Sequence, residues 1–379
     1  MNIKVVNFVI AAITLLFSAN VFAAAPIKIG ALFAVTGPAA FLGEPERNSA
    51  KMVVDEINKS GGVKGHMLEL VVYDTSGDAT KAVQLATKLI KDDKVVAIIG
   101  PSTTGETMAV IPVAERSMIP LISCSAGSKI TDPVKKLVFK TAQNDSLAVG
   151  KIYEYLQKRK LTKVSLLTVS DGFGASGREQ LKIQAPRYGI TVVSDDTYGP
   201  KDTDMTAQLT KIRGSHAQAI ICWGTNPGPA LVAKNVRQLG IKTPLFMSHG
   251  VSSKKFIELA GTAAEGIKLP SGKVIVADML PASDKQKKSL MAFVKDYQRH
   301  YNAEGDHFGG HAWDAVMLIR NAIDNGAVTA AAIRDRIENT RGFAGIGGTF
   351  NFSAHDHAGL GKDAFVLVEV KNKDWKIVK

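Results

Sequence analysis

Residues 95–123 read VVAIIGPSTTGETMAVIPVAERSMIPLIS, and this stretch decides the fold. It begins with Val95–Ile99, a short run rich in β-branched residues, which predicts a buried strand. A turn of glycine, proline and hydroxyl residues follows, and Thr104–Arg116 then has the composition of a helix. Leu121–Ser123 predicts the next strand. A strand, a helix and a strand in so short a span indicate a parallel β-α-β unit.

The same alternation extends to both sides of this stretch. Upstream, the sequence predicts strands at Ile27–Phe33 and Met67–Asp74 and helices at Glu44–Ser60 and Ala79–Lys91. Downstream the pattern restarts, so the fold class is α/β with two doubly wound units of similar size in series. The strands predicted for the second unit are Lys163–Val169, Thr191–Asp195, Ala219–Trp223 and Pro244–Ser248, and its helices are Ala148–Arg159, Gly177–Tyr188, Met205–Gly214 and Pro227–Leu239.

The C-terminal part departs from this alternation. Gln286–Glu338 is predicted to be rich in helix, and the chain closes with Ala364–Val370 and Trp375–Val378 around Lys371–Asp374. The last two segments predict an antiparallel hairpin. Two open α/β sheets that face each other leave a cleft at the carboxyl ends of their strands, and we expect the ligand site there.

Composition excludes several classes of protein. The chain has 379 residues, 45% of them hydrophobic, which is globular composition. Two cysteines, Cys124 and Cys222, are too few for a disulfide scaffold or a cysteine zinc cage. The net charge is +12, but the lysines are scattered without interleaved aromatic residues, so we expect no nucleic-acid partner.

The N-terminus has the layout of a secretory signal peptide, residues 1–25. Lys4 precedes a nearly continuous apolar run, Val5–Val21, and small residues follow at Ala23–Ala25 before Pro26. The alternative, a membrane anchor, is disfavoured by these small residues. No cysteine lies near the cleavage point, so we expect a periplasmic protein without a lipid anchor. Removal of Lys4 leaves a mature charge of +11, that is, 46 basic minus 35 acidic residues.

Gly172–Gly177 reads GFGASG and follows a predicted strand, as the G-x-G-x-x-G motif of dinucleotide-binding folds does. Asp195 and Asp196 lie about 20 residues further on, where such a fold places its ribose ligand. An NAD-dependent dehydrogenase is therefore one alternative. The other interpretation, a glycine-rich turn between strand and helix, is favoured because an exported protein is separated from the cell's pool of nicotinamide cofactors.

The sequence gives little support for a metal site or for covalent catalysis. His307, His311 and Asp314 have helical spacing for metal ligands, but the pair Gly309-Gly310 weakens a helix there, and a helix from His311 is expected instead. The cluster His355–His357 has the composition of a solvated loop. No serine-hydrolase, zinc-protease or P-loop motif is present. We therefore expect no metal, no cofactor and no enzymatic activity.

Two strand-to-helix turns carry glycine and hydroxyl residues: Gly100–Gly105 and Ser123–Ser128. Free backbone N–H groups at a helix start, beside Ser and Thr hydroxyls, form a cradle suited to a carboxylate. Ordinary helix capping explains one such turn. Two turns in adjacent units of one sheet meet at its carboxyl edge, which favours a binding site.

Three longer motifs point to a family. They are IKIGALFAVTGPAAFLG (27–43), DEINKSGGVKGHMLELVVYDTSGD (55–78) and AIIGPSTTGETMAVIPVAERSMIPLIS (97–123), with a later echo in AWDAV (312–316) and GTFNFS (348–353). In this order they resemble the periplasmic leucine/isoleucine/valine-type solute-binding proteins of ABC importers. The resemblance implies two Rossmann-like lobes with a three-crossover hinge, which close over a ligand. Lobe 1 would comprise residues 26–145 and 277–350, and lobe 2 residues 146–276 and 351–379.

The resemblance also implies site residues. The ligand carboxylate would be held at the first turn by Thr104, beside Thr103, and at the second turn by Ser125–Ser128. In that second turn Ala126 and Gly127 would offer N–H groups, and Ser128 would substitute for the threonine that the family often has at Gly127. Phe173 would be the aromatic that covers the ligand, presented by the Gly172–Gly177 loop. Phe41 and Leu42 would form an apolar wall, and Thr225 matches another position that faces the cleft.

His249 is the informative departure from the family pattern. Amino-acid binders of this type commonly carry Glu there, paired with the ligand ammonium. A buried ammonium without a carboxylate partner is expensive, whereas histidine can donate to a carboxylate, hydroxyl or keto oxygen. The hypothesis is a hydrophobic carboxylate without an α-amino group: an aromatic, keto or branched aliphatic acid. In the rival hypothesis Asp145 or Asp171 supplies the counter-charge and the ligand is a branched-chain amino acid.

The expected partners are this ligand and an inner-membrane ABC permease, with the protein itself a monomer. An extracytoplasmic ligand sensor remains an alternative, because the same fold serves transport and sensing.

Overall fold

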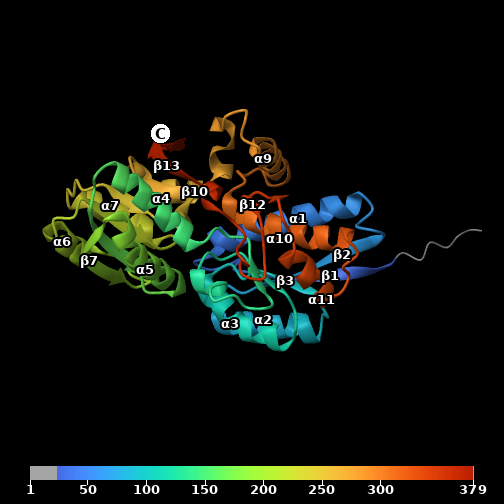
Figure 1. Ribbon diagram of the computed structural model, residues 1–379. Helices are drawn as coiled ribbons and strands as arrows, with labels where there is room; N and C mark the ends of the chain where they lie inside the picture. Colours follow the sequence, from blue (N-terminus) through green and yellow to red (C-terminus); the bar gives the residue numbers. More distant parts are fainter. Residues whose placement is uncertain (1–23, 379) are drawn as a thin grey trace, which may run out of the picture.

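The computed structural model describes residues 24–378 and contains two open α/β units side by side (Figure 1). The predicted signal peptide lies almost entirely outside the described residues. The first unit is built on a sheet with the order β2-β1-β3-β4-β5, in which every neighbouring pair is parallel. Its strands are β1 (Ala24–Phe33), β2 (His66–Asp74), β3 (Ala97–Ile99), β4 (Leu121–Ser123) and β5 (Val138–Lys140).

The second unit is built on a sheet with the order β14-β13-β10-β9-β8-β6-β7. The strands from β10 to β7 are parallel, and the C-terminal pair β13 and β14 is added antiparallel at the β10 edge. The strands are β6 (Lys163–Val169), β7 (Thr191–Tyr198), β8 (Ala219–Trp223), β9 (Leu245–Met247), β10 (Lys268–Gly272), β13 (Phe365–Lys371) and β14 (Asp374–Ile377).

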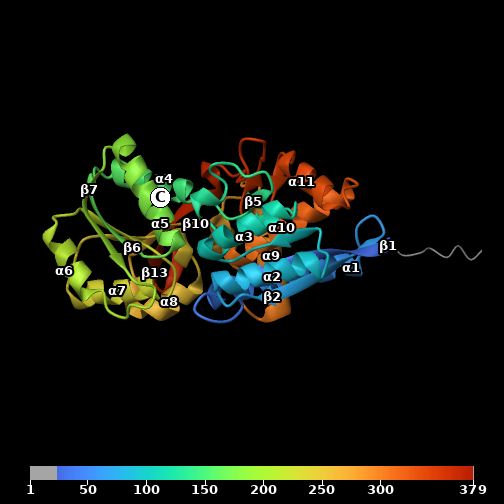
Figure 2. The same ribbon diagram turned by 90° about the horizontal axis from the view of Figure 1, so that it is seen from below.

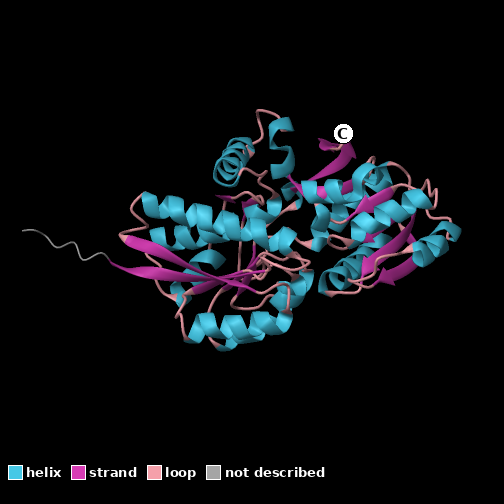
Figure 3. Cartoon of the chain, turned by 180° about the vertical axis from the view of Figure 1, so that it is seen from behind, coloured by secondary structure: helices cyan, strands magenta, loops and turns pink. Residues whose placement is uncertain are grey.

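Helices cover both faces of each sheet, as Figure 3 shows. In the first unit, α1 (Ala40–Lys59), α10 (His307–Asp324) and α11 (Ala330–Glu338) pack on one face, and α2 (Ala79–Lys91) and α3 (Thr104–Arg116) on the other. In the second unit, α4 (Asp145–Lys158) and α5 (Gly172–Gln184) pack opposite α6 (Thr206–Gly214), α7 (Gly228–Gln238) and α8 (Lys254–Ala260). Each unit therefore buries its own apolar core.

The chain passes between the two units three times. It leaves the first sheet after β5, leaves the second sheet after β10, and returns from the first unit before β13. Between the last two passages lie α9 (Lys287–Tyr301), α10, α11 and the short pair β11 (Phe343–Ala344) and β12 (Thr349–Phe350). Figure 2 shows α9, α10 and α11 on the side of the first unit. The fold is therefore the two-lobed, three-crossover α/β architecture. Within residues 24–378, no helix combines the length and apolar character of a membrane span.

The C-terminal hairpin is confirmed. β13 and β14 pair antiparallel, with Lys371 opposite Asp374. The two turn residues, Asn372 and Lys373, both have positive φ, 57° and 59°. Such a turn matches the right-handed twist of the strands that it joins.

Three predicted helix starts are wrong by four or five residues, and each has a local cause. The first helix begins at Ala40, not Glu44, because the N–H groups of Leu42 and Gly43 already donate to the Ala39 carbonyl and close its first turn. α5 begins at Gly172, not Gly177, because the Asp171 side chain accepts from the Gly174 N–H and caps the helix there. α10 begins at His307, not His311, because Asp306 caps it through the Gly309 N–H.

Candidate ligand-binding site

A cavity of about 340 Å³ lies between the two units, at the carboxyl ends of their strands. The first turns of α1, α2, α3, α5, α7 and α10, or the residues that cap them, contribute to its wall. Each helix start carries free N–H groups and the positive end of the helix dipole. These helix ends favour negative charge in the cavity.

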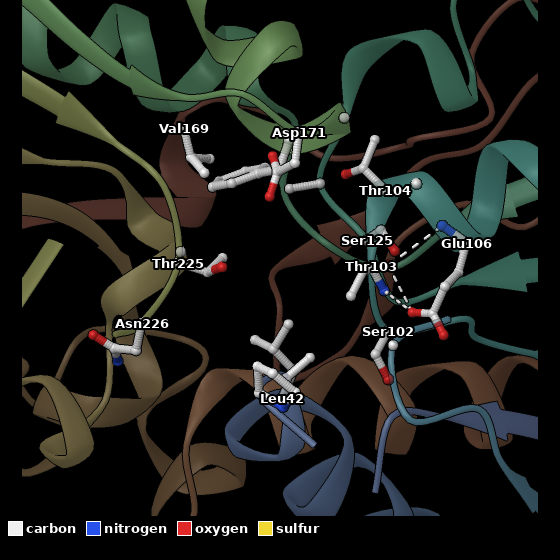
Figure 4. Close-up of a pocket in the computed structure, with 18 of the residues that line it drawn as sticks. Leu42, Ser102, Thr103, Thr104, Glu106, Ser125, Val169, Asp171, Thr225 and Asn226 are labelled. Atoms are coloured by element: carbon white, nitrogen blue, oxygen red, sulfur yellow. Dashed lines mark hydrogen bonds between the residues drawn. The ribbon is translucent and has the colours of Figure 1, made fainter. Parts of the chain in front are cut away.

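The N-terminus of α3 supplies one polar wall of the cavity. Thr103 is the N-cap: its hydroxyl accepts from the Glu106 N–H, and the Glu106 carboxylate accepts from the Thr103 N–H and hydroxyl. Thr103 thus lines the cavity with a hydroxyl that is already used. The Thr104 hydroxyl makes no hydrogen bond within residues 24–378, and Figure 4 shows the Thr104 side chain directed into the cavity. Thr104 is therefore the free hydroxyl of this turn.

The turn after β4, Ser125–Ser128, contributes fewer residues to the cavity wall than predicted. Ser125 lines the cavity, but its hydroxyl donates to the Pro101 carbonyl at 2.9 Å and is left only as an acceptor. Ala126 also lines the cavity, and its N–H is unpaired within the described chain. Behind the turn, the fully buried Lys140 ammonium donates to the carbonyl oxygens of Ala126 and Gly127, at 2.7 and 3.2 Å. A positive charge thus lies directly behind the wall of the cavity.

Gly127 and Ser128 do not line the cavity, contrary to expectation. A Cβ on Gly127 would lie 2.4 Å from Cγ2 of Thr104, so the glycine makes room for the Thr104 side chain. The Ser128 hydroxyl donates to Asn144 Oδ1, and its N–H donates to Ser176 Oγ on α5. Ser128 is therefore part of a contact between the two units and is unavailable to a ligand in this conformation.

Aromatic side chains line the side of the second unit. Phe173, in the first turn of α5 and not in a loop, lines the cavity and packs against Trp223 with ring centroids 5.9 Å apart. Leu42 projects from α1 on the opposite side (Figure 4). Phe41 lies outside this cavity, edge-on to Phe308, and lines a separate groove between α1, α8 and α9. The predicted apolar wall therefore consists of Leu42 and not Phe41.

Thr225 and Asp171 face the cavity from loops of the second unit. Figure 4 shows the Thr225 hydroxyl and the Asp171 carboxylate both directed into the open space. One Asp171 oxygen accepts from the Gly174 N–H as the cap of α5, and burial raises the pKa of this carboxyl. Glu106 is the other carboxyl in the cavity wall, and it is held in the α3 capping box.

His249 lines the cavity from the turn after β9. It meets three aromatic rings edge-on, those of Phe173, Trp223 and Phe365, with centroids 5.3–5.7 Å apart. Burial lowers its pKa well below the usual value, so the ring is neutral. Its Nε2 lies 3.7 Å from Oδ1 of Asp145.

Asp145 stands behind this wall and does not line the cavity. Its other oxygen accepts from Ser176 Oγ at 2.5 Å. Burial raises its pKa, and the nearby Lys140 charge opposes that shift. Asp171 is therefore the better placed of the two carboxylates that the sequence offered as a counter-charge.

His307 and His311 also line the cavity, from the first turn of α10. The sequence suggested them only as metal ligands. Among residues 24–378, no group of three or more His, Cys, Asp or Glu side chains is arranged to hold a metal ion. Asp314 points elsewhere and accepts from the N–H groups of Ile346 and Gly347. The helical spacing of His307 and His311 was the available sequence signal, and it was considered only as the spacing of a metal site.

The glycines of the G-x-G-x-x-G stretch have packing roles. A Cβ on Gly174 would lie 1.8 Å from the Val169 carbonyl oxygen, and one on Gly177 would lie 2.1 Å from Nε1 of Trp223. The Asp195 carboxylate, which the dinucleotide alternative needs for a ribose, is bonded to Arg178 and Lys182. Close helix–strand packing therefore explains the motif.

Comparisons with known proteins agree with this architecture. A family described as periplasmic binding protein matches residues 26–374. The Leu/Ile/Val-binding protein homolog 3 of Brucella melitensis is 26% identical over 343 residues, covering 88% of this chain and 90% of that protein. An extracellular ligand-binding receptor from Rhodopseudomonas palustris HaA2 is similar in structure, with a TM-score of 0.87, 28% identity, and coverage of 93% of this chain and 99% of that one. The branched-chain amino acid transporter substrate binding protein of Streptococcus pneumoniae, solved with isoleucine, has a TM-score of 0.82 and 28% identity, covering 93% and 99%.

Proposed function

Because the chain belongs to the periplasmic binding protein family, we propose that it is the extracytoplasmic solute-binding component of an ABC importer for a small hydrophobic carboxylate without an α-amino group. Residues 1–25 would direct export, and the closed protein would present the ligand, as a monomer, to an inner-membrane permease. Closure would be a population shift, since only the closed form contacts the ligand from both lobes. No catalytic step is part of this role.

The polarity of the cavity is the observation that carries the proposal. Several helix N-termini and the ammonium of Lys140 surround it, and this arrangement favours an anion. The Thr104 hydroxyl and the Ala126 N–H are free donors on the side of the first lobe. A ligand carboxylate placed there would find donors and a favourable field together.

The rest of the wall suits an apolar ligand body. Leu42, Val169, Phe173 and Phe308 contribute apolar surface around the polar turn. His249 is neutral and surrounded by aromatic edges, and so it offers no negative charge to an ammonium. An aromatic, keto or branched aliphatic acid fits this combination.

A branched-chain amino acid is the second candidate. The Asp171 carboxylate faces the cavity and could pair with a ligand ammonium. The names of relatives that bind leucine, isoleucine and valine favour the same ligand class. A ligand sensor that signals to a receptor would use the same site.

Calorimetric titration tests the proposal. Phenylpyruvate, 4-methyl-2-oxopentanoate and benzoate would be compared with leucine and phenylalanine, after unfolding and refolding to remove ligand retained from the host. We expect at least one acid to bind in the micromolar range or tighter, and the amino acid of the same skeleton to bind far more weakly. Tight leucine binding with no response to any acid would replace the first candidate by the second.

A further inference from the structure

Three histidines form a cluster in the wall of the cavity whose hydrogen-bonding capacity the protein leaves unused. His249, His307 and His311 have relative exposures of 2%, 1% and 2%. Five of their six ring nitrogens have no hydrogen-bond partner in the described chain: both of His249, both of His307, and Nδ1 of His311. A buried polar atom without a partner is costly, so an occupant of the cavity must supply partners.

The protonation pattern of His311 follows from its one partner. Gln143 Nε2 donates to the Gly347 carbonyl at 2.9 Å, and a carbonyl can only accept, so the amide oxygen of Gln143 must face His311. That oxygen lies 3.1 Å from His311 Nε2, which therefore carries the proton. His311 is neutral because burial lowers its pKa well below the usual value; the nearby Cys124 carbonyl opposes that shift but makes no hydrogen bond with Nδ1 within residues 24–378. Its Nδ1 is thus a bare acceptor in the cavity wall.

His307 complements His311. The two rings are nearly perpendicular, with centroids 5.2 Å apart. Burial lowers the pKa of His307 to about 3, so its ring is neutral and offers one donor and one acceptor. The Ser252 carbonyl lies close enough to raise that pKa slightly, but not in hydrogen-bonding geometry. Together the pair presents an acceptor that no group among residues 24–378 satisfies, beside a donor that is likewise unpaired there.

Of the groups that could meet this pair, a hydroxyl fits best. It donates one hydrogen bond and accepts others, whereas a keto oxygen only accepts and a methylene does neither. The cluster lies next to the carboxylate turn, because Cys124, Ser125 and Ala126 of that turn line the same cavity as His307 and His311, and the Cys124 carbonyl approaches His311. The hydroxyl should therefore be near the ligand carboxylate.

Building on the proposed function, we propose that His311 Nδ1 and His307 bind a ligand hydroxyl, so that the preferred ligand is a 2-hydroxy acid. The hydroxyl donates to His311 Nδ1 and accepts from the His307 N–H. This assigns to the two residues a role in ligand selection, separate from that of the carboxylate turn.

Two series of ligands with constant skeletons test this by calorimetry on the wild-type protein. The first is 3-phenylpropanoate, phenylpyruvate, 3-phenyllactate and phenylalanine, and the second is 4-methylpentanoate, 4-methyl-2-oxopentanoate, 2-hydroxy-4-methylpentanoate and leucine. Within a series the hydroxy acid should bind about tenfold tighter than the acid without the hydroxyl, and severalfold tighter than the keto acid. Equal or tighter binding of the keto or unsubstituted acid would overturn the inference.

Variants and NMR test whether His311 is responsible for the preference for a hydroxy acid. His311→Phe keeps an aromatic ring and should reduce the advantage of the hydroxy acid to about twofold or less, while the exposed-site control His300→Phe should retain it. Persistence of the advantage in a folded His311→Phe protein would contradict the assignment. ¹⁵N spectra of histidine-labelled wild type read the tautomer without any variant, and a protonated His311 Nδ1 would overturn the inference whatever ligand binds. Tight amino-acid binding with no acid binding would instead refute the proposed function.

Discussion

Asp171→Asn separates the two candidate ligand classes because it changes their affinities in opposite directions. The substitution removes the charge of a carboxylate that faces the cavity. It should leave α5 intact, because asparagine accepts the Gly174 N–H as well as aspartate does at an N-cap. The change is therefore electrostatic and not structural.

The size of each effect follows from the dimensions of the cavity. A volume of about 340 Å³ corresponds to a sphere about 9 Å across. Two negative charges about 9 Å apart repel by about 2 kcal/mol at an effective dielectric constant of about 20, which is about twentyfold in affinity. Salt reduces this to severalfold. An ammonium that loses a charged hydrogen-bond partner loses about 1.5–3 kcal/mol, or roughly ten- to a hundredfold.

Calorimetry at pH 8 gives the clearest reading, since burial raises the pKa of Asp171 and the higher pH keeps it ionised. An acid ligand should bind the variant more tightly, and the gain should shrink as salt is added. Asp204→Asn is the matched control, because Asp204 accepts from the Thr206 N–H in a similar turn but lies outside the cavity. Weaker binding of the acid by Asp171→Asn, with the control unchanged, would refute the electrostatic reasoning.

Three further predictions concern single groups. Thr104→Val should weaken carboxylate binding about tenfold in calorimetry, since it removes a free hydroxyl without changing side-chain size, and Thr87→Val on α2 should have no effect. Lys140→Met should lower the free energy of unfolding in urea by about 2–3 kcal/mol, because it leaves the Ala126 and Gly127 carbonyls without their buried donor and removes the positive charge near Asp145. Adding Asp145→Asn should recover part of the loss. A single-variant loss below about 1 kcal/mol would contradict this. Burial lowers the pKa of His307 to about 3, so stability that the neutral ring provides above about pH 6.5 is lost as the pH falls. Below about pH 6, the free energy of unfolding of wild type in urea titrations should therefore fall by about 1.4 kcal/mol per pH unit more than that of His307→Asn. Parallel curves would disprove this.

Much of the fold could be predicted because its signals are local. Strands such as Val95–Ile99 and Ala219–Trp223 are short apolar runs bounded by turns, and a run of this kind specifies a buried parallel strand wherever it occurs. The predicted helix starts were less accurate, since the hydrogen bonds that decide where a helix begins come from single side chains. Asp171 and Asp306 each cap a helix at a place where the glycine content had argued against one.

The candidate site was predicted only in part, for a tertiary reason. The family resemblance pointed to Thr104, Phe173, Thr225 and His249, and the structure brings these residues to one cavity. Whether a turn residue faces a ligand depends on what packs behind it, and sequence does not reveal that. Ser128, for example, was expected at the ligand, but its hydrogen bonds go to Asn144 and Ser176.

Selectivity at this site is best understood as a property of a coupled group and not of one residue. The resemblance to leucine/isoleucine/valine-type binders implies glutamate at the position of His249, yet a carboxylate there would face Asp145, which is 3.7 Å from the present imidazole. Two buried carboxylates so close cannot both ionise, so one would remain protonated and the ammonium site would be incomplete. Asp145 is in turn held by Ser176 and balanced by Lys140, whose ammonium supports the carboxylate turn. The neutral histidine is therefore consistent with Lys140 and Asp145, and the proposed preference for an anion without an ammonium rests on all three together.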